Sequence, residues 1–156
     1  MDIFFESHKQ FLILLMEHDV EFMLIGGYAV IHYGYERTTG DMDIWLKPTN
    51  ENRDKFIKAL NTFGINKELL VEVGKMNFED AHVLHFGERP DKIDFLTKVS
   101  GLTYNEADAK KTFLPLKDKL VPVIDFNHLI VLKMIAGRPQ DIADVDILQK
   151  IHKNRK

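Results

Sequence analysis

Two adjacent glycines, Gly26 and Gly27, follow a short apolar run and most constrain how this chain can fold. The run at 22–25 is apolar throughout, which is typical of a buried strand, and the residues after the glycines suit a short helix. Because glycine has no side chain, its backbone can approach an anion closely, and the N–H groups that open a helix favour negative charge. The pattern therefore predicts a strand–turn–helix unit whose turn can hold phosphate groups.

Thirteen residues separate Gly27 from Asp41, the first of two aspartates in an alternating stretch. Residues 42–46 alternate in the manner of a strand, so Asp41 and Asp43 point to the same face. Two such carboxylates repel each other unless one is protonated or a cation bridges them. Carboxylate oxygens suit Mg²⁺, which commonly combines one or two of them with water and substrate phosphates. The alternative is a pair of solvated surface aspartates, which the short spacing from the glycine turn disfavours.

A third aspartate, Asp94, alternates with apolar residues in a stretch that we expect to form a strand over 92–97. If this strand lies next to the one that carries Asp41 and Asp43, the three carboxylates share one face of a sheet. A third carboxylate can complete a site for two metal ions or assist an attacking hydroxyl group. In the other arrangement Asp94 is an ordinary exposed strand residue.

Length and composition restrict the class of protein. The 156 residues and the formal net charge of −3 fit one domain and disfavour a large polynucleotide partner, because nucleic-acid binders usually carry a basic surface. The absence of cysteine excludes disulfides, thiolate catalysis and cysteine zinc sites. No apolar run is long enough to span a membrane, and the N-terminus lacks the basic start of a secretory signal. We therefore expect a cytoplasmic protein with no membrane partner.

Hydrophobic periodicity and turn residues predict a single domain, 1–156, with a core over about 1–98 and a helical C-terminal extension over about 99–156. The expected helices cover 2–18, 28–33, 51–63, 66–73, 104–111, 126–136 and a segment that starts at Pro139. The expected strands cover 22–25, 42–46, 81–86, 92–97, 113–116 and 120–124. This order predicts an α/β or α+β architecture, with a mixed β-sheet and helices packed mainly on one face.

With these motifs in place, the chain resembles the DNA-polymerase-beta-like nucleotidyltransferase superfamily. The signature of that superfamily is a hydrophobic residue followed by Gly-Gly or Gly-Ser and then, after a short gap, aspartates that alternate with hydrophobic residues. Residues 25–27 and 41–44 match these two parts, and residues 93–95 match a later hydrophobic-Asp-hydrophobic element. Many members have Ser where this chain has Gly27, so only the backbone can contact phosphate there.

Within the superfamily, the chain is most similar to small bacterial nucleotidyltransferase-like proteins, including those related to abortive-infection and toxin–antitoxin systems. Residues 37–43 fit their Arg-x-Thr-x-Asp-x-Asp string. Lys133 and residues 137–144 fit a lysine-bearing helix followed by Gly-Arg-Pro-x-Asp-x-x-Asp. The resemblance runs from about residue 20 to residue 150 and implies the nucleotidyltransferase fold.

The resemblance and the residue chemistry together define a candidate site. The expected metal ligands and catalytic residues are Asp41, Asp43 and Asp94, and the expected nucleotide-binding residues are Gly26, Gly27, Arg37, Thr39 and Lys133. The implied cofactor is Mg²⁺, or Mn²⁺ in its place. Lys133 lies in an apolar helix, so its partner is either a phosphate group or an ion pair with Asp141 or Asp144. Arg138 is expected to brace the last two helices against the same two carboxylates.

The predicted function is Mg²⁺-dependent transfer of a nucleoside monophosphate from an NTP to an acceptor hydroxyl, with release of pyrophosphate. The acceptor is left open between a small molecule, tRNA and a partner protein. The chain lacks the additional domain that larger superfamily members use to hold the acceptor, so we expect binding on a small surface, at a homodimer interface or on a partner. The alternative function is a catalytically silent module that binds a nucleotide or a toxin–antitoxin partner.

Overall fold

The computed structural model describes residues 3–155. Its helices are α1 (Glu6–Glu17), α2 (Gly26–His32), α3 (Asn50–Phe63), α4 (Lys67–Gly74), α5 (Tyr104–Asp108), α6 (Phe126–Ala136) and α7 (Pro139–Asn154). Its strands are β1 (Phe22–Ile25), β2 (Asp41–Leu46), β3 (Val83–Phe86), β4 (Lys92–Leu96), β5 (Thr112–Leu116) and β6 (Lys119–Val123). None of the described helices is long and apolar enough to cross a membrane.

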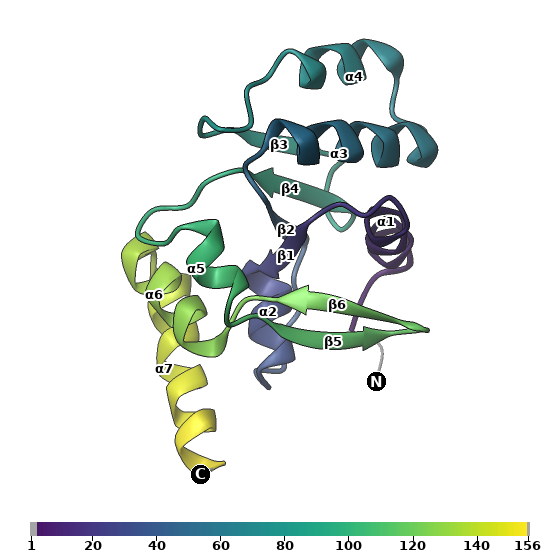
Figure 1. Ribbon diagram of the computed structural model, residues 1–156. Helices are drawn as coiled ribbons and strands as arrows, with labels where there is room; N and C mark the ends of the chain where they lie inside the picture. Colours follow the sequence, from purple (N-terminus) through teal and green to yellow (C-terminus); the bar gives the residue numbers. More distant parts are fainter. Residues whose placement is uncertain (1–2, 156) are drawn as a thin grey trace.

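The six strands form one mixed sheet in the order β3-β4-β2-β1-β6-β5 (Figure 1). Strands β2 and β4 are parallel, as are β1 and β6, and the other neighbours are antiparallel. This arrangement confirms the predicted mixed sheet of an α/β architecture. Because β4 is hydrogen-bonded directly to β2, the two aspartate-bearing strands lie side by side in the sheet.

Helices α1 and α3 cover one face of the sheet, where an aromatic cluster forms much of the core. The ring of Phe95 on β4 lies 5.5 Å from that of Phe11 on α1 and 4.7 Å from that of Phe56 on α3. Met42 and Ile44 of β2 are fully buried. These apolar residues of β2 and β4 alternate with the aspartates, so their burial on one face directs the aspartates to the other.

The C-terminal helices lie on the side of the other face of the sheet. Trp45 of β2 is buried there, with its ring edge-on to Tyr104 of α5 at 5.4 Å. The indole Nε1 of Trp45 donates a hydrogen bond to the backbone oxygen of Thr97. Trp45 therefore covers this face of the sheet just beyond Asp43. An open site on this face can begin only at Asp43. Helices α6 and α7 lie together at one side of the molecule, away from α3 and α4 (Figure 1).

Capping residues place several helix ends where the sequence predicts them. The side chain of Thr49 accepts a hydrogen bond at the start of α3, and Gly64 ends that helix with a φ of 105°. Asp125 accepts two backbone hydrogen bonds at the start of α6. The first helix starts at Glu6 rather than at residue 2, which lies outside the described residues. Helix α2 starts at Gly26, two residues before the expected position, so the glycine pair forms its first turn.

Candidate active site

The register of the sheet brings the predicted carboxylates to one face. In the parallel pair of β2 and β4, Asp43 lies opposite Asp94. Asp41 lies two residues before Asp43 in β2, so its side chain is on the same side of the sheet. Side chains of residues paired in this way point in the same direction. Asp94 therefore joins the other two aspartates, as its position between apolar residues predicts.

Asp43 has the most perturbed carboxyl group of the three. Burial, followed by the charges of Asp94 and Asp41, raises the pKa of Asp43 to about 6, and the charges of Lys133 and Arg138 partly oppose this rise. A carboxylate that is both desolvated and surrounded by like charge is stabilised by a nearby cation. The electrostatics at Asp43 therefore favour a positively charged ligand.

The glycine pair packs directly against the carboxylates and the loop before them. Gly26 has a φ of +66°, and a Cβ atom built on it would collide with the carboxylate of Asp43. A Cβ atom built on Gly27 would collide with the hydroxyl of Thr39, which donates a 2.9 Å hydrogen bond to the backbone oxygen of Asp41. Both positions need glycine because the start of α2 approaches β2 so closely.

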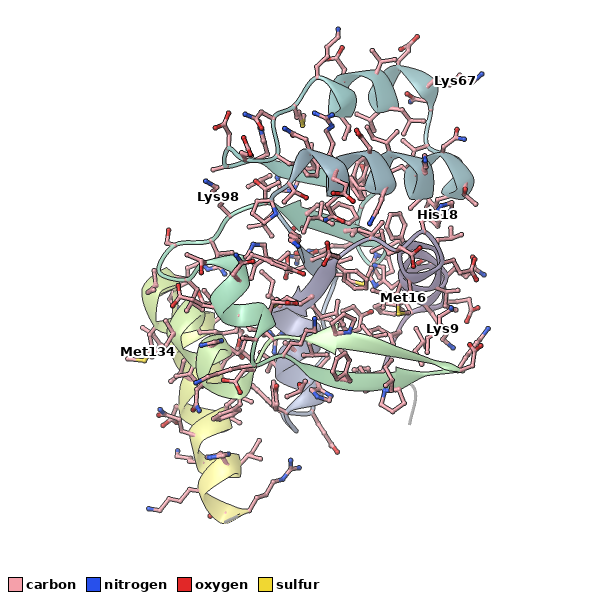
Figure 2. All side chains as sticks on the ribbon, in the orientation of Figure 1. Lys9, Met16, His18, Lys67, Lys98 and Met134 are labelled. Atoms are coloured by element: carbon pink, nitrogen blue, oxygen red, sulfur yellow. The ribbon has the colours of Figure 1, made fainter. Side chains whose placement is uncertain are left out.

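A cleft of about 490 Å³ opens beside Asp43 and Asp94, between the β3–β4 side of the sheet and α6. Its size is in the usual range for a small-molecule site. Its polar lining residues are Gly26, Asp43, Asp94, Lys98, Ser100, Lys133, Arg138 and Asp141, and its apolar ones are Ile25, Val83, Leu96, Val99, Leu129, Leu132, Ile135 and Ala136. Lys98 projects from the segment that follows β4 (Figure 2).

Lys133 makes ion pairs with carboxylates, which is one of the two alternatives that the sequence leaves open for its ammonium group. It is buried in α6, and its Nζ atom lies 2.9 Å from Asp144 and 3.3 Å from Asp141. Arg138 braces Asp141 as expected, with its Nε atom 2.7 Å from the carboxylate. Because Lys133 also lines the cleft, the pairs hold its ammonium group at the wall of the candidate site.

Four predicted residues are outside the lining of this cleft, namely Gly27, Arg37, Thr39 and Asp41. The guanidinium group of Arg37 lies 3.2 Å from Asp144 and so joins the same buried network as Lys133. Thr39 holds the loop before β2, as described above. In this structure these two side chains contact Asp144 and the backbone of Asp41, neither of which lines the cleft.

Three residues that sequence reasoning did not select contact the carboxylates: Arg89, His85 and Lys92, whose Nζ atom lies 3.6 Å from Asp94. The guanidinium group of Arg89 makes two hydrogen bonds to Asp41, at 3.1 and 3.3 Å. The imidazole Nδ1 of His85 lies 2.6 Å from a carboxylate oxygen of Asp94. His85 lies opposite Asp94 in the β3–β4 hairpin, so the hairpin register was the signal that could have identified it. Arg89 gives no such signal, because it lies in the turn between the two strands.

Within residues 3–155, no three histidine, aspartate or glutamate side chains are close enough together to hold a metal ion in this arrangement. Asp41 faces Arg89, and Asp94 faces His85 and Lys92. The donor set nevertheless fits a hard divalent cation, because three carboxylates share one face and the central one is desolvated among like charges. Binding of such an ion would require Asp41 and Asp94 to exchange their present partners for it.

Comparison with solved structures gives the same fold. The lincosamide antibiotic adenylyltransferase LnuA, solved with lincomycin bound, superimposes with a TM-score of 0.60 at 15% sequence identity, over 97% of this chain and 99% of that protein. An antigenic nucleotidyltransferase-like protein from Paracoccidioides brasiliensis gives a TM-score of 0.51 at 14% identity, over 90% of this chain and 72% of that protein. No curated protein sequence matches the chain significantly.

The sequence itself matches a family model over residues 5–156, which is nearly the whole chain. That family is described as nucleotidyl transferase of unknown function (DUF2204). The match includes the glycine turn, the three aspartates and the α6–α7 network. The chain therefore belongs to this family of nucleotidyltransferases.

Proposed function

We propose that the chain transfers a nucleoside monophosphate from an NTP to the hydroxyl group of a small molecule, in a reaction that depends on Mg²⁺ or Mn²⁺. The observation that carries this proposal is the register that sets Asp43 beside Asp94, next to Gly26, at the floor of a cleft. Paired carboxylates beside a glycine turn are suited to a metal-bound triphosphate.

Asp41, Asp43 and Asp94 are the residues that would hold the metal. When bound, the metal neutralises the phosphate charge and lowers the pKa of a coordinated hydroxyl. The backbone N–H groups of Gly26 and Gly27 donate to the phosphates, and Lys133 adds positive charge at the cleft wall. Much of the rate enhancement comes from this positioning and charge stabilisation.

The chemical step is an in-line displacement at the α-phosphorus. The acceptor oxygen forms a bond to that phosphorus, and the bond to the bridging oxygen of pyrophosphate breaks, so that pyrophosphate leaves with the electron pair. Asp94 takes the proton of the acceptor hydroxyl.

Arg37 and Thr39 act as positioning residues in this scheme. Arg37 holds Asp144, which in turn holds Lys133, and Thr39 keeps the loop of Asp41 against Gly27. Their effect on the nucleotide is therefore transmitted through Lys133 and through Asp41.

The lining of the cleft favours a small acceptor over tRNA. Eight of the sixteen lining residues are apolar, and three of them, Val83, Ile135 and Ala136, are exposed. Lys133 and Arg138 are already paired with carboxylates, so among the described residues Lys98 is the one lining cation without an ion pair, which is few for a polynucleotide that is bound through many phosphates. Exposed apolar side chains at the edge of a cleft commonly contact a ligand with apolar surface. The structural neighbour LnuA acts on a lincosamide antibiotic, which is also a small molecule.

The test is an acceptor screen read by mass. The protein is incubated with each NTP and Mg²⁺, and with small hydroxylated compounds, tRNA or candidate partner proteins. We expect a small compound to gain the mass of one NMP while pyrophosphate is released. Asp43→Asn should abolish both signals, whereas Asp146→Asn, at an exposed carboxylate of α7, should change neither.

Other results of the same screen would contradict the proposal. Labelling of tRNA or of a partner protein, with no small compound labelled, would reject the acceptor class. Stabilisation by NTP without pyrophosphate release from any acceptor would instead support a silent nucleotide-binding module. Undiminished transfer by Asp43→Asn would reject the catalytic site itself.

A further inference from the structure

The guanidinium group of Arg89 covers the carboxylate of Asp41, one of the three expected metal ligands. Its Nε atom lies 3.1 Å from one oxygen of Asp41 and its Nη2 atom lies 3.3 Å from the other, so both carboxylate oxygens are engaged. The side chain of Arg89 is nevertheless 74% exposed. A contact of this kind neutralises the carboxylate but stabilises the fold only weakly, because water competes for both partners.

The residues around the Arg89–Asp41 contact leave room for the arginine side chain and hold the turn that carries it. The aliphatic part of Arg89 passes over Gly40, where an added Cβ atom would come within 2.9 Å of Arg89 Cδ. On the other side of the turn, Asp91 accepts a 2.6 Å hydrogen bond from the hydroxyl of Ser7. The turn is therefore tethered to the body of the protein, while Asp41 is the only hydrogen-bond partner of the Arg89 side chain within residues 3–155.

We propose that Arg89 is a further nucleotide-binding residue, which pairs with Asp41 before the metal–nucleotide complex binds and contacts the triphosphate afterwards. This inference rests on the proposed function, because it needs Asp41 to be a metal ligand. A divalent cation at Asp41 takes the carboxylate oxygens and repels the guanidinium group. The triphosphate that accompanies the metal then offers the guanidinium group a new anionic partner.

A guanidinium group suits this exchange. Its planar donors bind carboxylates and phosphates in the same two-pronged manner, so Arg89 can leave Asp41 without losing that type of hydrogen bonding. The exposed side chain has room to reorient, and its release is inexpensive because the pair with Asp41 is weak. Arg89 thus disfavours binding of the metal alone and favours binding of the metal with nucleotide.

The first arm of the test measures metal affinity without nucleotide. Mn²⁺ is titrated against the full chain and the free ion is read by electron paramagnetic resonance. Removal of the competing cation in Arg89→Gln should tighten Mn²⁺ binding by about two- to five-fold. The matched control is Lys150→Gln, which removes a cation from the exposed pair with Asp146 on α7 and should leave Mn²⁺ binding unchanged.

The second arm measures the affinity for ATP at saturating Mn²⁺, by equilibrium binding of labelled ATP without acceptor. Loss of a charge-assisted phosphate contact in Arg89→Gln should weaken ATP binding by about ten-fold. Arg89→Lys should recover only part of this affinity, because an ammonium group keeps the charge but not the two-pronged geometry. In an Asp41→Asn background, Arg89→Gln should no longer tighten Mn²⁺ binding.

The inference predicts that Arg89→Gln changes the two affinities in opposite directions, with tighter Mn²⁺ binding and weaker ATP binding. If Arg89→Gln weakens both Mn²⁺ and ATP binding, Arg89 has a structural role and the inference is wrong. If Arg89→Gln changes neither affinity while Asp43→Asn abolishes Mn²⁺ binding, the metal site is supported and only the proposed role of Arg89 is wrong. If the unmodified protein binds no Mn²⁺, with or without ATP, both this inference and the proposed metal dependence fail.

Discussion

At the scale of single residues, Asp43 combines a chemical role with a cost to the fold. Burial and the charges of Asp94 and Asp41 raise the pKa of Asp43 from 3.8 to about 6. The folded protein therefore binds this proton more tightly than the unfolded chain does. The cost of the charged form is fully present above about pH 6 and disappears as the pH falls below about 4.

Asp43→Asn should therefore stabilise the metal-free protein at pH 7.5 while it abolishes transfer. A shift of about two units corresponds to a gain of roughly 1–3 kcal/mol after allowance for solvent screening. Urea unfolding of both proteins in EDTA gives the difference, which should shrink towards zero at pH 4. A variant that is less stable at pH 7.5 would show that the carboxylate of Asp43 is already compensated in the fold.

Gly26 provides a second prediction at this scale. Gly26→Ala should lower stability and also abolish Mn²⁺ binding, because the new Cβ atom would displace the carboxylate of Asp43. Gly64→Ala is the matched control, since Gly64 also has a positive φ, of +105°, but a Cβ atom there would meet nothing within 4 Å. The control should lose about 1–2 kcal/mol of stability and keep its metal affinity. Equal metal affinity in the two variants would contradict the proposed site.

The sequence predicted the positions of the three aspartates because alternation along a strand decides which face a side chain occupies. It could not predict that Arg89 contacts Asp41, because that contact depends on the turn between β3 and β4, whereas the hairpin register offered a signal for His85 beside Asp94. Nor could it show that Arg37 reaches Asp144, since 107 positions separate the two residues. The local sequence pattern thus predicts where the carboxylates lie, whereas their contact partners depend on tertiary structure.

At the scale of elements, helices α6 and α7 are joined by a buried charge network. Asp144 is fully buried and contacts Lys133, Arg37 and Gln140, while Asp141 contacts Lys133 and Arg138. Removal of one member of such a network leaves a buried charge without compensation, which costs much more than the pair itself contributes. The network therefore fixes α7 against α6 and sets the position of Lys133 at the cleft.

Lys133→Met should destabilise the protein by about 3 kcal/mol, because it leaves two buried carboxylates short of a cation. Asp144→Asn in the same chain should restore part of this loss, and a double-mutant cycle by urea unfolding measures the coupling. An unchanged stability together with weaker ATP binding would assign Lys133 to the nucleotide alone.

Element boundaries were predictable wherever a local signal marks them. Strand β1 covers 22–25 as predicted, and Thr49, Gly64 and Asp125 lie at the helix ends that their side chains or backbone favour. The start of α1 was missed because Phe5, the residue that precedes it, has no side-chain cap to reveal it. Helix α5 is shorter than expected, since it ends at Asp108 rather than at residue 111.

At the scale of the whole molecule, the site draws on both halves of the chain. The carboxylates come from β2 and β4, whereas α6 supplies much of the cleft wall. Strand β6 pairs with β1 in the middle of the sheet, and α5 covers Trp45. Strand β6 and helix α5 of the expected extension over 99–156 therefore pack against strands of the expected core over 1–98.

A fragment of residues 1–98 should consequently fail to fold on its own. It would lack β6, leaving one edge of β1 without a partner, and it would expose the buried ring of Trp45. Its urea denaturation, followed by Trp45 fluorescence, should show no cooperative transition. A cooperative transition with native-like fluorescence would show that the N-terminal half is an independent domain.

The central claim is that three aspartates on one face of the sheet hold a divalent cation beside the glycine turn. Crystals grown with Mn²⁺ and a non-hydrolysable ATP analogue test it through anomalous scattering. We predict an anomalous peak within about 2.0–2.2 Å of carboxylate oxygens of Asp43 and at least one of Asp41 and Asp94. A bound nucleotide with no anomalous peak at these carboxylates, or a peak confined to other residues, would contradict the claim.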